Sequence, residues 1–167
     1  GATGTYLQEK GLLIGEVPEA WNFSHPDAVR NMAAEYAMAG ADVVETNSFG
    51  GNRFRLQAFG MADRVREVNR VAAELAREGV GQDRFVMGSM GPTGEKVMED
   101  RTQQDTIYAA FVTQAAALAE GGVDGVCVET MMTVVEAKQA IRAAKTTGLP
   151  VMASMTLLLP HPFGPTM

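Results

Sequence analysis

Four short apolar runs, each bounded by turn-forming residues, recur along the chain. They cover residues 42–46, 85–89, 125–130 and 151–156. Their apolar character is nearly continuous and lacks the alternation of a strand that has one face in water. This pattern predicts strands buried on both faces, as in a parallel sheet.

The segments between these runs have helical periodicity. Over residues 103–121 and 133–147, apolar side chains return every three or four positions, which places them on one face of a helix. The two predicted buried stripes are Ile107, Phe111, Ala115 and Leu118, and Val134, Ala137, Ile141 and Ala144.

Helix boundaries are marked by capping residues and glycines. Paired residues with capping-box or related spacing predict helix starts, and glycines that follow helical stretches predict left-handed ends. The start pairs are Ser24 with Asp27, Thr102 with Asp105, and Thr133 with Glu136; the end glycines are Gly40, Gly79, Gly121 and Gly148.

An internal repeat supports a fold built from strand and helix units. The sequence AGADVVET at 39–46 returns in looser form as GGVDGVCVET at 121–130. Repeated units of this kind indicate either a (β/α)8 (TIM) barrel or a doubly wound open sheet, and the pattern leaves both open.

Polar residues gather at the carboxyl end of every predicted strand. In a parallel α/β fold these ends meet at one edge, where active sites form from several strands at once. We therefore predict a composite site there. Its candidate residues are Glu45, Thr46, Asn47, Ser48, Ser89, Glu129, Thr130, Ser154 and Thr156.

Composition narrows the function classes. The 167 residues are 46% hydrophobic and 20% charged, which predicts one globular domain over 1–167. The net charge of −6 argues against a nucleic-acid partner, and no apolar run approaches the roughly 20 residues of a membrane helix. With one cysteine and no signal-peptide pattern, the expected compartment is the cytoplasm and the expected partner a small molecule.

Individual candidates have alternative interpretations. Glu129 is predicted either to bind substrate or to pair with a structural donor, whereas Glu45 is assigned a structural role because two equivalent carboxylates rarely both contact one small substrate. Cys127 shares a face with Glu129, and we interpret it as a buried apolar residue. Neither His25 nor His161 has metal-ligand spacing with it, so no zinc is expected within 1–167.

The glycine pair in the stretch GATGT at 1–5 is a weak phosphate-loop signal, because no strand is visible before it. We predict a tight turn at a strand end. A pterin- or nucleotide-binding α/β domain would require phosphate binding at Gly1.

Several stretches, in order and at compatible spacing, resemble the homocysteine S-methyltransferase family, most closely the homocysteine-binding domain of cobalamin-dependent methionine synthase. The resemblance implies that the chain is roughly the first half of a (β/α)8 barrel, from the end of strand one through strand five. The stretches are GATGT at 1–5, GEVPEAWN at 15–22, AGADVVETNSF at 39–49 with Asn52 and Arg53, GSMGPTG at 88–94, VET at 128–130 with Glu136 and Ala137, and PVMASMT at 150–156.

The resemblance also implies a chemistry. In the family, zinc held by three cysteine thiolates activates homocysteine as a thiolate, which accepts a methyl group. Glu129 corresponds to the residue that holds the α-amino group, with Gly1, Ala2, Thr46, Asn47 and Ser89 around it. The resemblance implies that the zinc cysteines lie beyond Met167. It also implies that another domain or subunit supplies a corrinoid or folate methyl donor.

Two departures from the family pattern leave open an alternative to the methyltransferase function. The acidic residue that precedes the first glycine turn would lie before Gly1, and the stretch 157–165 is more apolar and proline-rich than the polar loop usual there. The alternative is a truncated or split half barrel that binds or assembles without catalysis. A half barrel would leave two strand edges and its interior face uncovered, so such a chain is expected to associate.

Overall fold

A four-stranded parallel sheet is the centre of the computed structural model, which describes residues 3–95 and 101–156. The predicted strands are confirmed to within one residue at each end, and their spatial order follows the sequence. The strands are β1 (Val43–Glu45), β2 (Phe85–Met90), β3 (Gly125–Met131) and β4 (Val151–Met155).

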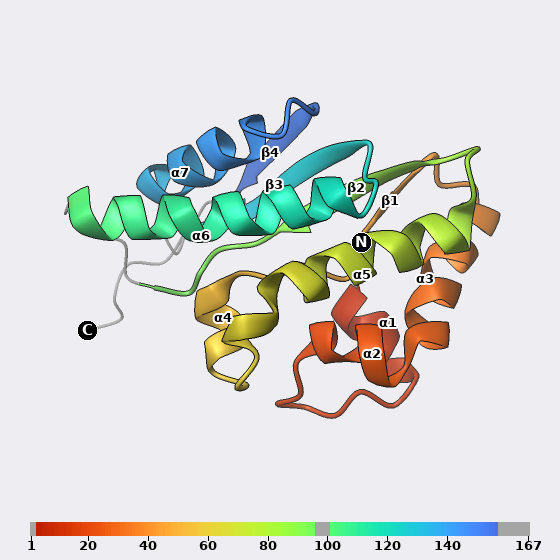
Figure 1. Cartoon of the computed structure of the whole chain (residues 1–167). Coiled ribbons are helices and arrows are strands. Elements are labelled where there is room, and N and C mark those ends of the chain that lie inside the picture. Colours follow the sequence, from red (N-terminus) through yellow and green to blue (C-terminus); the bar gives the residue numbers. More distant parts are fainter. Residues whose placement is uncertain (1–2, 96–100, 157–167) are drawn as a thin grey trace, which may run out of the picture.

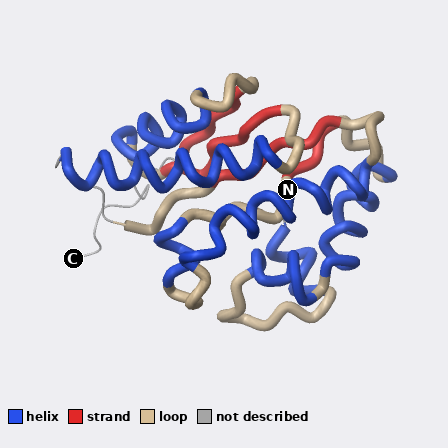
Figure 2. The backbone as a smooth tube through the Cα atoms, viewed as in Figure 1, coloured by secondary structure: helices blue, strands red, loops and turns tan. Residues whose placement is uncertain are grey.

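Four long helices alternate with the strands and pack against one another in chain order (Figure 1). They are α3 (Pro26–Met38), α5 (Val65–Val80), α6 (Arg101–Glu120) and α7 (Val134–Lys145). A helical crossover is what allows successive strands to run parallel, and Figure 2 shows the four strands side by side next to these helices. Shorter helices are α1 (Thr3–Glu9), η1 (Pro18–Ala20), α2 (Trp21–Ser24), α4 (Arg53–Gln57) and η2 (Ala62–Arg64).

The core lies between the helices and one face of the sheet. Val86 and Val126 point from the strands into a buried cluster that contains the whole predicted α6 stripe. The opposite face is only partly covered by the described residues: Val43, Phe85 and Met152 are 48%, 61% and 55% exposed, whereas Cys127 is buried. The prediction of burial on both faces is therefore confirmed in the middle of β3 and wrong elsewhere on this face, because helices flank only the face that is the outside of a barrel.

Helix starts match the capping prediction at one of three places. Thr133 caps α7, its hydroxyl accepting the Glu136 backbone N–H at 3.2 Å. Ser24 instead belongs to α2, and His25 occupies the cap before α3 because Pro26 begins that helix directly. Thr102 lies inside α6 and so does not start it.

Glycines end four helical stretches, but two of the predicted left-handed positions are displaced. Gly121 instead permits the close approach of α6 to α5, since a Cβ there would lie 2.5 Å from the Cβ of Ala73. The left-handed conformation occurs at Gly40 and Gly148 as predicted, and at Gly81 and Gly122 in place of Gly79 and Gly121.

Two further local predictions are wrong. The stretch predicted as a tight turn enters helix α1 at Thr3, while Gly1 and Ala2 lie outside the described residues. Val134, predicted to be buried on α7, is the first residue of that helix and is 57% exposed, whereas Ala137 and Ala144 further along are buried.

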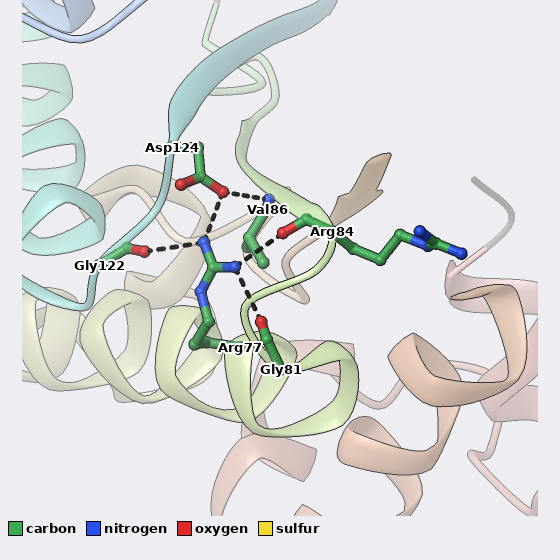
Figure 3. A network of polar contacts seen from close by, with 6 residues as sticks. All are labelled: Arg77, Gly81, Arg84, Val86, Gly122 and Asp124. Atoms are coloured by element: carbon green, nitrogen blue, oxygen red, sulfur yellow. Dashed lines mark hydrogen bonds and ion pairs between the residues drawn. The ribbon is translucent and has the colours of Figure 1, made fainter. Parts of the chain in front are cut away.

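A polar network joins the amino ends of β2 and β3 to α5. Arg77 donates to the carbonyl of Arg84 at 2.8 Å and forms an ion pair with Asp124, whose carboxylate also accepts the Val86 N–H at 2.7 Å. Burial alone raises the pKa of Asp124, but these two partners outweigh it and hold that pKa below its usual range. Figure 3 shows the network, which consists of Arg77, Gly81, Arg84, Val86, Gly122 and Asp124.

Across the described ranges, no helix combines the length and the apolar character needed to cross a bilayer.

Candidate active site at the carboxyl ends of the strands

A cavity of about 770 Å³ opens at the carboxyl ends of β1, β2 and β3. Its volume lies in the range of small-molecule sites, roughly 300–1,000 Å³. Residues from three strands and their following loops line it, as the composite-site prediction requires. Among the lining residues are Val17, Glu19, Thr46, Asn47, Phe49, Gly50, Phe54, Arg55, Ser89, Thr93, Glu129 and Thr130.

Glu129 faces this cavity, as predicted, and is held by a neighbouring strand. The Ser89 hydroxyl of β2 donates to Glu129 Oε1 at 2.5 Å. Ser89 is only 2% exposed, so its donor is oriented by packing before any ligand arrives. The assigned contact of Glu129 with a substrate stays a prediction.

Thr46 uses its hydroxyl within the protein. Its Oγ1 accepts the Ser89 backbone N–H at 3.0 Å, and the Ser48 hydroxyl donates to the Ser89 carbonyl at 2.8 Å. Since the single proton of Ser48 is used in that bond, Thr46 is the donor in the 2.5 Å contact between the two hydroxyls. Thr46 therefore positions Ser89, and through it Glu129.

Asn47 likewise bonds to the protein wall. Its side-chain amide donates to the carbonyl of Pro18 at 2.7 Å and to Asn22 Oδ1 at 2.9 Å, and Asn22 donates back to the Asn47 carbonyl at 3.1 Å. Both asparagines are 2% exposed. This reciprocal pair fixes the segment 17–22 as one wall of the cavity.

Glu19 is a buried carboxylate that the sequence prediction missed. It is 3% exposed and accepts the Gly50 N–H at 2.5 Å. Burial raises its pKa, while the Gly50 bond and the nearby Arg55 act in the opposite direction. An acidic residue beside Pro18 resembles an ordinary exposed loop residue in sequence, and only its place in the stretch 15–22 indicates a special role.

The loop after β2 is held by a second buried carboxylate. Glu136 of α7 is 3% exposed and accepts both the backbone N–H of Thr93 at 2.7 Å and its hydroxyl at 2.6 Å. Gly91 in the same loop lies under Phe49, where a Cβ would come within 2.5 Å of the ring. The stretch 88–94 is therefore fixed from both sides.

Backbone strain follows directly after Glu129. Thr130 has a φ of +59°, and is the one residue other than glycine with positive φ among the described residues. The pairing of β3 with β4 shifts register between Val128 and Met131. A β-branched residue in this conformation is unfavourable, and such strain is concentrated at functional sites.

Cys127, Glu45 and Glu129 form a compact group on the face of the sheet opposite the long helices. One ligand atom from each, the thiol sulfur and two carboxylate oxygens, lies within 4.8 Å of the others. Cys127 is 2% exposed, which confirms that it is buried. Burial, then the hydrogen bond with Glu45, raise the pKa of the thiol to about 12.

In this group Glu45 has a structural partner, the Cys127 thiol, and its assigned structural role stays a prediction. The metal-ligand spacing considered in the sequence involved only Cys127 and the two histidines, and did not include Glu45. The expectation of no zinc within 1–167 stays a prediction. His25 stacks on Trp21, and His161, with the rest of 157–167, lies outside the described residues.

A parallel sheet flanked by crossover helices, with a composite polar site at the carboxyl ends of its strands, is the arrangement of a (β/α)8-barrel enzyme. The family model of homocysteine S-methyltransferases matches residues 1–161, and the chain belongs to this family, whose members are enzymes.

Curated relatives at about 30% identity are methionine synthases. The chain is 32% identical over 175 residues to the Mycobacterium tuberculosis protein, a match that covers 94% of this chain and 15% of that protein. With the Mycobacterium leprae protein it is 31% identical over 157 residues, covering 87% and 13%. The chain thus spans a small part of the length of these relatives.

Solved structures support the fold. The metallated homocysteine methyltransferase MmuM from Escherichia coli superposes with a TM-score of 0.81 at 20% identity, covering 94% of this chain and 62% of that one. The apo form gives 0.71 at 21% identity, covering 94% and 58%. These neighbours are (β/α)8 barrels, so the prediction of a partial barrel is confirmed.

Proposed function

We propose that the protein containing this chain transfers a methyl group to the thiol of homocysteine or a related thiol. Family membership supports this activity, and the relatives named methionine synthase and homocysteine methyltransferase point to the same acceptor. The observation that carries the proposal is a carboxylate, Glu129, facing a cavity of about 770 Å³ at the barrel mouth. Such a site suits a small amino acid.

In this proposal Glu129 binds the α-ammonium group of the acceptor. A charged hydrogen bond of this kind is short and strong, and the bond from Ser89 at 2.5 Å already orients the carboxylate. Thr46 and Asn47 contribute indirectly: Thr46 positions Ser89, and Asn47 holds the cavity wall at Pro18. Gly1 and Ala2 remain proposed contacts for the other end of the amino acid.

The described residues do not fit the zinc set that the resemblance implies. That set has three thiolates, whereas Cys127 is the one thiol of the whole sequence and is buried with a raised pKa. We therefore derive no step through zinc. We propose that its ligands lie beyond Met167, that a corrinoid or folate carrier supplies the methyl group, and that the protein is cytoplasmic.

The test is Glu129→Gln in the full-length protein. Loss of a charged hydrogen bond, worth about 1.5–3 kcal/mol, should raise the homocysteine KM about 10- to 100-fold and leave the bound zinc unchanged. Glu74→Gln is the matched control, because Glu74 is paired with Arg70 on the exposed side of α5. An unchanged KM would remove Glu129 from the site. A full-length protein without thiol methylation would favour the non-catalytic half barrel.

A further inference from the structure

Two carboxylates approach each other on the face of the sheet that lies inside the barrel. Glu45 ends β1, and Glu129 stands two residues beyond Cys127 on β3, so strand alternation puts the thiol and this carboxylate on the same face. Their ligand atoms and that of Glu45 lie within 4.8 Å of one another.

Each carboxylate has its own donor from the protein. The buried Ser89 hydroxyl donates to Glu129 at 2.5 Å, and the thiol of Cys127 hydrogen-bonds to Glu45. Because the thiol carries its proton, it is the donor in that pair. An ionised carboxylate has about four acceptor positions, so both groups can accept further hydrogen bonds.

The spacing suits one nitrogen between the two carboxylates. A nitrogen about 2.9 Å from each oxygen requires that the oxygens be no more than about 5.8 Å apart. The observed limit of 4.8 Å satisfies this condition. Two negative charges this close also repel, and a cation between them removes the repulsion.

We propose that Glu45 is a second carboxylate for the α-ammonium group of the thiol substrate, acting with Glu129, and that Cys127 is a positioning residue that orients Glu45. This inference rests on the proposed function and adds a specificity determinant to the same site. It makes the site selective for an amino acid over a simple thiol acid.

An ammonium group suits these three residues better than a divalent metal ion. It offers three N–H donors, which two carboxylates can share. A metal would need the thiolate of Cys127 and so would have to displace the thiol proton, whereas an ammonium group leaves the thiol as the donor to Glu45. The cavity beside Glu45 is lined mostly by apolar side chains, including Met87 and Met152, and Glu45 is its one carboxylate among the described residues.

The experiment compares two probes on the full-length protein by titration calorimetry: L-homocysteine and its desamino analogue, mercaptobutanoate. Glu45→Gln should weaken homocysteine binding about 10-fold, as for one lost charged hydrogen bond, and change mercaptobutanoate binding less than about 2-fold. Cys127→Ala should weaken homocysteine binding about 3-fold, whereas Cys127→Ser, which keeps a donor, should restore it. Glu74→Gln again serves as control.

The outcomes separate the inference from the proposed function. If the unmodified protein does not bind homocysteine, the proposed function fails. If it binds and Glu45→Gln binds equally well, or loses both probes equally while its unfolding midpoint is unchanged, only the role of Glu45 is refuted. Loss of one equivalent of zinc in Cys127→Ala would overturn the inference in favour of a metal site.

Discussion

The two ends of the strands are built on different principles. At the amino end, Arg77 and Asp124 satisfy each other and several backbone groups, so charge is paired inside the protein. At the carboxyl end, Glu129 faces a cavity with one neutral donor, and Thr130 has a strained backbone. The amino end therefore stabilises the sheet, and the carboxyl end keeps a carboxylate directed into the cavity.

Because of this difference, we expect substitutions to change the free energy of unfolding and the ligand affinity separately. A change at the amino end should lower the free energy of unfolding without altering ligand affinity. A change at the carboxyl end should do the reverse, except where a residue also supports the packing of a loop. Both arrangements involve the same two strands, β2 and β3.

The largest effect is expected at Gly91, where one substitution should lower both the stability and the ligand affinity. Gly91→Ala places a Cβ within 2.5 Å of the Phe49 ring, and overpacking of this kind costs about 3 kcal/mol. Denaturant unfolding should show this loss together with weaker homocysteine binding. As control, Gly4→Ala in α1 adds a Cβ with nothing within 4 Å and should not destabilise. Unaltered stability of Gly91→Ala would mean that Phe49 moves freely.

A smaller effect, on stability alone, is expected at Asp124. Asp124→Ala removes the carboxylate partner of Arg77 and the acceptor of the Val86 N–H, and should cost about 2 kcal/mol at neutral pH, with homocysteine binding unchanged. Because the pKa of Asp124 is lowered in the folded protein, its stabilisation is complete above the unfolded value of 3.8 and is lost as pH falls through the folded value.

The difference between the unmodified protein and Asp124→Ala should therefore narrow below about pH 4, which unfolding curves at several pH values can measure. A constant difference down to pH 2 would contradict the assigned role of the charge.

The smallest effect is expected at Thr130. Thr130→Gly removes strain of about 1–2 kcal/mol but adds about 0.5–1 kcal/mol of unfolded-chain entropy, for a net stabilisation of about 0.5 kcal/mol. Thermal unfolding should show a slightly higher Tm. In Thr113→Gly, within α6, the same substitution should lower the Tm. A lower Tm in both would show that Thr130 is not strained.

The sheet and the helical core could be predicted because periodicity and glycine placement report directly on burial. Ile107, Phe111 and Leu118 follow a helical stripe and are fully buried, and the four apolar runs are the four strands. The direction of the parallel strands then placed Ser89 and Glu129 at one edge. The choice of a barrel over an open sheet could be predicted only from the resemblance to the family.

The remaining site residues depend on contacts between distant segments, which no local pattern encodes. Glu19 is buried only because the backbone of Gly50 folds over it, and Glu136 only because the Thr93 loop turns back onto α7. Position 130 has a common residue, threonine, in a rare backbone conformation, so the sequence does not indicate its strain. The approach of Glu45 to Cys127 joins residues of β1 and β3, which are far apart in the sequence.

Cys127 has a consequence for redox chemistry. The nucleophile in disulfide exchange and in oxidation is the thiolate, and a thiol whose pKa burial raises to about 12 supplies almost none at neutral pH. If the proposed thiol substrate binds here, such a residue does not compete by forming a mixed disulfide. The interior of this barrel therefore offers a sulfur that donates a hydrogen bond while staying inert towards oxidants and alkylating agents.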